Sequence, residues 1–233
     1  MIGKNIVELE ALTKVFPSPS GEVVLFGGLS FAAKQGDFVA ITGATGCGKT
    51  TLLNIIAGLD AATSGRVCVA GKEYVGLTDD EITGLRATNI GVVFQSSGLM
   101  PNLNVEENIE LPLVLRGLGQ IERGKKVQEE IEFFGLGKKR NARIQALSVG
   151  ERKKVSIARA VVTQPDILLL DEPTSGLDTP TVNILMPLLR GMHFRHSRTI
   201  MMATNNLETA RIASRELPVE RPTVVPSPSN EKV

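Results

Sequence analysis

Residues 43–50, Gly43-Ala44-Thr45-Gly46-Cys47-Gly48-Lys49-Thr50, fit the pattern G-x-x-x-x-G-K-[ST] and decide the fold. The apolar stretch Phe38–Thr42 before them predicts a buried strand, and Lys49–Gly58 after them predicts a helix. Glycines let the backbone turn its N–H groups inward, and the helix adds the positive end of its dipole. This strand-loop-helix context predicts a phosphate-binding loop and disfavours the alternative, a flexible glycine turn with an exposed lysine.

The phosphate loop predicts MgATP as the ligand. Lys49 is expected to reach the β- and γ-phosphates, and the Thr50 hydroxyl is expected to ligate Mg²⁺. The residues predicted to bind the nucleotide in this region are Gly43, Gly46, Cys47, Gly48, Lys49, Thr50 and Thr51.

An acidic pair, Asp171 and Glu172, follows the continuous apolar run Ile167–Leu170. Such a run predicts a central parallel strand, and ligands bind at the carboxyl ends of parallel strands. Asp171 is expected to hold Mg²⁺, and Glu172 is expected to polarise the attacking water. For a pair taken alone, simple solvent exposure at a strand end is the alternative, but the phosphate loop favours the catalytic interpretation.

Strand and helix patterns alternate along the chain, which predicts an α/β fold with a mainly parallel sheet. Further strands are expected at 7–12, 67–69, 90–94 and 198–203, and further helices at 105–116, 121–134, 151–162, 179–194 and 206–213. We expect an ATP-binding core formed by residues 1–95 and 166–216, with residues 96–165 as an inserted helical subdomain. The remaining residues, 217–233, are rich in Pro, Ser and charge and are expected to form a disordered tail.

Composition limits the location and the partners of the chain. The net charge of +1 gives no reason to expect a nucleic-acid partner, and the apolar runs are too short to span a bilayer. The first ten residues contain acidic side chains where a signal peptide would be apolar, and two cysteines give no disulfide framework. These features predict a cytoplasmic protein that reaches a membrane only through a partner.

Three more segments complete a series. They are Gln95 after the strand at 90–94, the run Leu147-Ser148-Val149-Gly150-Glu151, and the run Asp171-Glu172-Pro173-Thr174-Ser175-Gly176-Leu177-Asp178. Together with the phosphate loop, and in this order, they resemble the nucleotide-binding domains of ABC ATPases over nearly the whole chain. The resemblance implies a RecA-like P-loop NTPase core of the ABC type with an N-terminal antiparallel β region.

The resemblance also implies roles for residues that patterns alone do not assign. Gln95 would contact Mg²⁺ and the attacking water, Phe16 would stack on adenine, and Asp178 would lie at a dimer contact. Ser148 and Gly150 would contact the γ-phosphate bound to the opposite subunit, so two subunits would form the sites head to tail. Phe16 as a core aromatic is an alternative, and Ser148 with Glu151 is also spaced as a helix-capping box. The basic clusters 138–140 and 152–154 are interpreted as solvated helix faces.

The stretches 77–86 and 90–109, which contain Leu99-Met100-Pro101-Asn102-Leu103, are similar to lipoprotein-release and macrolide-export ATPases. This narrower resemblance implies a second ABC ATPase subunit and an integral membrane permease as partners. It places the chain at the inner face of the plasma membrane.

Three departures from the family pattern bear on turnover. Val149 replaces a glycine, and Asn205 takes the place of a histidine expected to act on the γ-phosphate. Losing one donor aimed at developing charge costs roughly 10²–10³ in rate. The glycine-turned strand pair that ends the family's core is also missing after 215–218.

Two functional hypotheses follow from these departures. The first is a transport ATPase, slow or in need of an intact partner subunit. The second is a module that dimerises on ATP and hydrolyses little or none of it. A third, an ABC-type domain acting on DNA or ribosomes, lacks support because the chain has neither a basic excess nor a long coiled-coil insertion.

Overall fold

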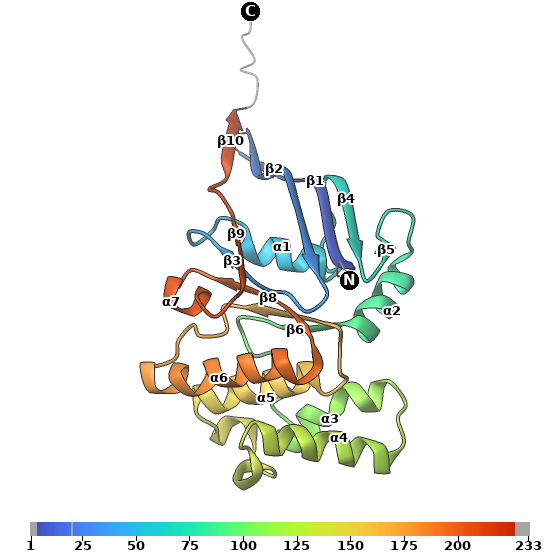
Figure 1. Ribbon diagram of the computed structural model, residues 1–233, viewed down its shortest axis with the longest axis vertical. Coiled ribbons are helices and arrows are strands. Elements are labelled where there is room, and N and C mark those ends of the chain that lie inside the picture. Colours follow the sequence, from blue (N-terminus) through green and yellow to red (C-terminus); the bar gives the residue numbers. More distant parts are fainter. Residues whose placement is uncertain (1–3, 20, 227–233) are drawn as a thin grey trace, which may run out of the picture.

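The computed structural model describes residues 4–19 and 21–226 and contains two sheets with helices packed around them (Figure 1). The central sheet has the order β6-β7-β8-β3-β9, and every neighbouring pair in it is parallel. Its strands are β6 (Ile90–Val93), β7 (Ile167–Asp171), β8 (Thr199–Thr204), β3 (Phe38–Thr42) and β9 (Arg215–Pro218). Strands β3, β7 and β8 are buried at every residue, as expected for a parallel sheet covered on both faces.

The second sheet is antiparallel and has the order β10-β2-β1-β4-β5. Its strands are β1 (Asn5–Ser18), β2 (Gly21–Lys34), β4 (Ser64–Val69), β5 (Lys72–Glu73) and β10 (Thr223–Pro226). The α/β class, the mainly parallel core and the N-terminal antiparallel region are therefore confirmed.

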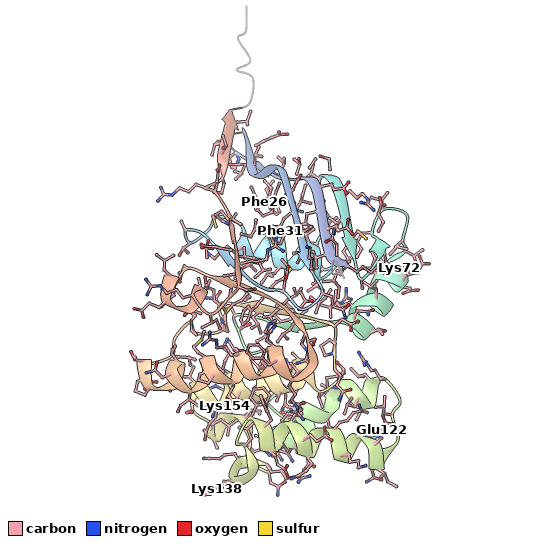
Figure 2. All side chains as sticks on the ribbon, viewed as in Figure 1. Phe26, Phe31, Lys72, Glu122, Lys138 and Lys154 are labelled. Carbon is pink, nitrogen blue, oxygen red and sulfur yellow. The ribbon has the colours of Figure 1, made fainter. Side chains whose placement is uncertain are left out.

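Helix α1 (Lys49–Ile56) lies between the two sheets, and most of the other helices lie on the far side of the central sheet (Figure 1). The helices after α1 are α2 (Asp79–Asn89), α3 (Val105–Leu115), α4 (Gln120–Phe133), α5 (Val149–Val161), α6 (Thr179–His196) and α7 (Leu207–Ala210), with short 3-10 turns η1 (Gly137–Lys139) and η2 (Ile144–Ala146). None of the helices within the described ranges is long and apolar enough to cross a membrane. Charged side chains such as Lys72, Glu122 and Lys138 lie at the outer surface (Figure 2).

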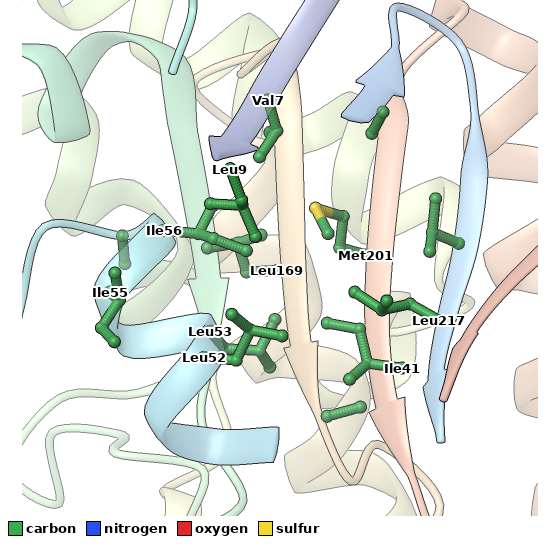
Figure 3. Close-up of a cluster of buried hydrophobic side chains, with 14 of the residues drawn as sticks. Val7, Leu9, Ile41, Leu52, Leu53, Ile55, Ile56, Leu169, Met201 and Leu217 are labelled. Atoms are coloured by element: carbon green, nitrogen blue, oxygen red, sulfur yellow. The ribbon is translucent and has the colours of Figure 1, made fainter. Parts of the chain in front are cut away.

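Four strands of the central sheet, β3, β6, β7 and β8, contribute to two cores because successive side chains point to opposite faces. Leu169 and Met201 join Ile41 and α1 in the core beneath the antiparallel sheet (Figure 3). Leu168 and Met202 point the other way, into a cluster shared with α3, α4, α5 and α6. The sheet therefore holds the nucleotide-loop side and the helical side together in one body.

The chain after Leu217 corrects an expectation. We expected disorder from residue 217 and no final strand pair, but β9 pairs with β3 and β10 pairs with β2. The Val219 N–H donates to the Thr42 carbonyl at 2.7 Å, which continues the pairing beyond β9. The prediction was wrong for residues 217–226 because strand pairing supplies the order that the polar composition does not indicate, and residues 227–233 lie outside the described part.

Gly91 in β6 offers a test of how tightly the helical side packs on the sheet. A Cβ atom at this position would lie 2.4 Å from the Ala160 carbonyl oxygen of α5 and 3.0 Å from Pro165. Because backbone atoms cannot move aside cheaply, Gly91→Ala is expected to lower the free energy of unfolding by about 1–3 kcal/mol. Urea denaturation monitored by circular dichroism measures this change.

Gly84 provides the matched control. It lies exposed within α2, where an added Cβ would meet nothing within 4 Å. Alanine is a better helix former than glycine, so Gly84→Ala is expected to stabilise the protein by up to about 1 kcal/mol. Equal effects of the two substitutions would contradict the packing described for Gly91.

Candidate functional site

The phosphate loop connects the end of β3 to the start of α1, at the carboxyl edge of the central sheet. Gly48 has φ 103°, a left-handed conformation that favours glycine. Gly43 has little room, because a Cβ there would lie 2.5 Å from the Val219 carbonyl oxygen and 2.6 Å from Cys47 Sγ. The C-terminal segment thus forms one wall of the loop, and Cys47 is buried beneath it.

Lys49 is drawn back over the loop that precedes it. Its Nζ donates to the carbonyl oxygens of Gly43 and Ala44 at 3.0 and 3.2 Å. The same Nζ lies 3.7 Å from Oε1 of Glu172, and the lysine is only 6% exposed. Lys49 was predicted to reach the phosphates and Glu172 to polarise the attacking water. The structure brings these two side chains, from distant segments of the chain, next to each other. Thr51 follows part-exposed on the first turn of α1.

Thr50 and Asp171 form the second contact across the site. The Thr50 hydroxyl lies 2.9 Å from Oδ2 and 3.1 Å from Oδ1 of Asp171. Burial raises the pKa of Asp171, against the opposing effects of the Thr50 hydrogen bond and the nearby charges of Lys49 and Lys153. Two oxygen donors meet here, and Mg²⁺ prefers oxygen ligands, so these side chains fit the predicted metal.

Glu172 holds a strained backbone conformation, with φ 45°. Its N–H donates to the Ala203 carbonyl of β8 at 2.9 Å, and its own carbonyl accepts from Ser175 at 3.1 Å. Non-glycine residues in this region cost energy and persist where the surroundings impose them. The two bonds therefore hold the backbone of Glu172 directly after β7, and its carboxylate lies beside Lys49 Nζ.

Asn205 reaches the phosphate loop from the end of β8. Its Nδ2 donates to Thr45 Oγ1 at 3.3 Å, and both residues lie near the molecular surface. Thr45 was not predicted as a site residue, because a threonine at a variable position of the loop carries no signal of its own. The contact places Asn205 beside the loop, at the position where the family resemblance implies a histidine.

Gln95 follows β6 with an exposed side chain, and its carbonyl accepts from Lys153 Nζ at 3.1 Å. Lys153 is 4% exposed, so the interpretation of residues 152–154 as a solvated face was wrong for this residue. Arg140 likewise is not simply solvated, since it pairs with Glu106 of α3. The sequence offered one signal for the burial of Lys153. It lies three residues before Ser156, so the two side chains share one face of α5, and both are buried.

The segment 147–151 begins α5. Ser148 accepts from the Glu151 N–H at 3.1 Å while Glu151 accepts from the Ser148 N–H at 2.8 Å, which confirms the predicted capping box. Gly150 packs on α6, since a Cβ there would lie 2.4 Å from Thr181 Cγ2. Within the described residues, no hydrogen bond or ion pair links this segment to the loop at 43–50 of the same chain.

Two residues flank this segment at the surface. Val149 is 48% exposed, and Asp178 caps α6 by accepting from the Thr181 N–H at 3.1 Å. Val149 adjoins Ser148 and Gly150 in the chain, and Asp178 lies close to them because Thr181 contacts both Asp178 and Gly150.

Phe16 lies near the end of β1 and is 39% exposed, so it is not a core aromatic. Lys14 Nζ lies 4.6 Å from the centre of its ring, within the range of a cation–π contact. Lys14 in turn forms an ion pair with Asp60 at 2.7 Å. One face of the ring is thus held by the protein, as suits an aromatic platform.

Comparison with known proteins agrees with this geometry. A protein-family model described as ABC transporter matches residues 26–175. The ABC transporter ATP-binding protein YbbA of Escherichia coli K12 is 38% identical over 210 residues, which cover 90% of this chain and 92% of YbbA. The macrolide export ATP-binding/permease protein MacB of Aggregatibacter actinomycetemcomitans is 37% identical over 93% of this chain. The chain spans only 33% of MacB, a much longer protein.

Two solved structures are similar to this chain, and the matches cover 99% and 87% of their own chains. The ATP-binding cassette MJ0796, in a dimeric post-hydrolysis state with ADP and Pi, superposes with a TM-score of 0.85 at 33% identity. The match covers 95% of this chain and 99% of MJ0796. The cassette cbiO1 of Clostridium perfringens, part of the transporter complex cbiONQ, superposes with a TM-score of 0.83 at 28% identity.

Proposed function

Because the chain belongs to the ABC transporter family, as an ATP-binding subunit and an ATPase, we propose that it closes head to tail with a second such subunit over MgATP and drives a membrane permease. The observation that carries this proposal is the meeting of Lys49, Thr50, Asp171 and Glu172 at one sheet edge. The similarity to YbbA and MacB supports an export or lipoprotein-release type of system.

Nucleotide binding would use the loop and its neighbours. When phosphates enter, Lys49 exchanges its two carbonyl partners for phosphate oxygens, and the N–H groups of 43–50 turn toward the anion. Phe16 supplies an exposed face for adenine, with Lys14 behind the ring. Thr50, Asp171 and Gln95 would hold Mg²⁺, which neutralises developing charge on the phosphates when bound.

Hydrolysis would then depend on Glu172 as the general base. The Glu172 carboxylate follows the end of β7, 3.7 Å from Lys49 Nζ, where it can accept a proton from the attacking water. Asn205 can donate one hydrogen bond from its amide toward the γ-phosphate, but it carries no charge. We therefore propose slow turnover, with binding intact because Lys49, Thr50 and Asp171 keep their contacts.

A second subunit would complete each site. Ser148 and Gly150 lie outside the chain's own phosphate loop, and the dimeric state of MJ0796 supports their contact with nucleotide on the opposite subunit. In a homodimer each site would contain both Val149 and Asn205, while a heterodimer with an intact partner would divide them between two sites. Attachment to the inner face of the plasma membrane would come through the permease.

The experiment that tests this function is steady-state ATP hydrolysis by the purified chain and its Asn205→His variant. Histidine adds a ring that can donate toward the γ-phosphate, so the variant is expected to raise kcat by about tenfold or more, as one restored donor allows. Phosphate release at saturating ATP measures the rate. Asn206→His is the control, because Asn206 instead caps α7 by accepting from Glu208 and Thr209.

The same assay distinguishes the alternative, a module that dimerises on ATP with little or no hydrolysis. The exposed Val149 and the uncharged Asn205 are the observations that favour it. ATP-dependent dimerisation without turnover in either protein would support that alternative. Absence of both binding and turnover would contradict the function as a whole.

A further inference from the structure

Three side chains of helix α5 donate hydrogen bonds to backbone carbonyls of residues 95–98, the segment that follows β6. Lys153 donates to the Gln95 carbonyl at 3.1 Å, and Ser156 donates to the Ser97 carbonyl at 3.0 Å. Arg159 donates to the Gly98 carbonyl at 2.8 Å and to the Ser97 carbonyl at 3.1 Å. The spacing of three residues puts the donors one above another, so they form a ladder along the helix.

The far end of the same segment is held from α3. Asn108 is fully buried, accepts from the Met100 N–H at 2.8 Å, and donates to the Met100 carbonyl at 3.1 Å. Its amide also lies within bonding distance of the Leu103 and Asn104 carbonyls, at 3.2 and 2.9 Å. The path of residues 95–104 is therefore fixed at both ends by helices rather than by the sheet that carries Asp171 and Glu172.

Lys153 is the rung of the ladder nearest to the nucleotide site. At 4% exposure its ammonium group must find partners inside the protein. The Gln95 carbonyl is one partner. Burial lowers the pKa of Lys153, and the nearby carboxylate of Asp171 partly opposes this effect. The buried lysine thus holds the backbone of Gln95 from the side of α5.

We propose that Lys153 is a positioning residue for hydrolysis, which fixes Gln95 relative to Asp171 and Glu172 and makes Gln95 move with α5. The inference rests on the proposed function. Because α5 begins at Ser148, which would face nucleotide on the opposite subunit, the Lys153 contact links the two ATP sites of a dimer. Contact at one site displaces α5, and the ladder carries that displacement to Gln95 of the other.

Lys153→Met tests the proposal because methionine fills similar space without a donor or a charge. Misplacing a catalytic group by about 1 Å costs up to 10²-fold in rate, so we expect kcat to fall by about tenfold or more. The Kd for ATP should stay within about twofold of the wild-type value, because Lys153 touches no group predicted to bind the phosphates. Phosphate release gives kcat, and fluorescence titration with a labelled ATP analogue gives the Kd.

Two further variants separate positioning from general support of the fold. Lys153→Gln restores a neutral donor and is expected to recover most of kcat, whereas Lys154→Met changes the next, partly exposed lysine and should leave kcat and Kd unchanged. If Lys153→Met lowers Tm so far that it unfolds, Ser156→Ala removes the next rung with a smaller change. It should then lower kcat without changing the Kd.

The outcomes distinguish this inference from the proposed function. A wild-type chain that hydrolyses ATP, with a Lys153→Met variant equally fast, overturns the role of Lys153 alone. The role is also overturned if Lys153→Met lowers kcat, ATP affinity and Tm together and Lys153→Gln restores none of the three. A wild-type chain that neither binds nor hydrolyses ATP overturns the proposed function, and this role with it.

Discussion

Replacing Glu172 with glutamine is expected to abolish steady-state ATP hydrolysis, with a loss of roughly 10²–10⁴-fold in kcat. Glutamine keeps the shape of the side chain but cannot accept a proton from water. The backbone bonds that hold residue 172, from its N–H to Ala203 and from Ser175 to its carbonyl, do not involve the side chain. The strand end should therefore keep its conformation, and only the chemical step should fail.

Phosphate release and size-exclusion chromatography with ATP together check this result. The variant should bind ATP and elute as a dimer, because hydrolysis no longer empties the sites. Glu208→Gln is the control, since Glu208 is an exposed glutamate at the start of α7 and should retain the wild-type rate. A Glu172→Gln variant with more than about a tenth of the wild-type kcat would exclude Glu172 as the general base.

Replacing Lys49 with alanine is expected to weaken ATP binding by two orders of magnitude or more. Truncating one partner of a buried charge contact costs about 2–5 kcal/mol. Lys49 is 6% exposed and would exchange its two loop carbonyls for phosphate oxygens, so alanine leaves those oxygens without a donor or a positive charge. Glu172 loses its nearest cation as well, so turnover should be undetectable even at high ATP concentration.

Isothermal titration of ATP into the full chain measures the change in affinity. Lys72→Ala provides the control, because Lys72 lies exposed on β5 at the outer surface (Figure 2). Thermal unfolding shows whether both variants fold. Unchanged affinity in a folded Lys49→Ala protein would mean that the loop at 43–50 is not the phosphate site.

Elements with a marked apolar pattern could be predicted from the sequence. β3 and β7 read as unbroken apolar runs, because both of their faces are covered. Helix α2 was missed because none of its residues is buried, so no apolar stripe marks it. Its capping box, Thr78 with Glu81, was a readable signal that could have located its start.

Other elements had weaker signals. β2 contains Gly27-Gly28 and pairs with β1 through several register shifts, which interrupt the alternation that predicts a strand. β10 ends in a proline and owes its order to pairing with β2. Such long-range pairing is not visible in local composition.

Site residues could be predicted only where a local motif or the end of a strand fixes their position in the fold. A strand-loop-helix motif fixes Lys49 and Thr50 relative to each other, and strand ends in a parallel sheet bring Asp171 to the same edge. Thr45 and Lys153 could not be predicted in this way. Their roles come from contacts with Asn205 and Gln95, which reach them from distant strands.

The position of β3 in the sheet has a consequence for how the protein is made. β3 lies between β8 and β9, which begin at Thr199 and Arg215, so the strand that carries the phosphate loop is synthesised well before either neighbour. At roughly 5–20 residues per second, a ribosome needs on the order of ten seconds to bridge that interval. For that time the apolar strand Phe38–Thr42 lacks both of its neighbours, and the wall that Val219 forms beside the phosphate loop does not yet exist. The nascent chain therefore exposes a short apolar strand until residues 199–218 have been made.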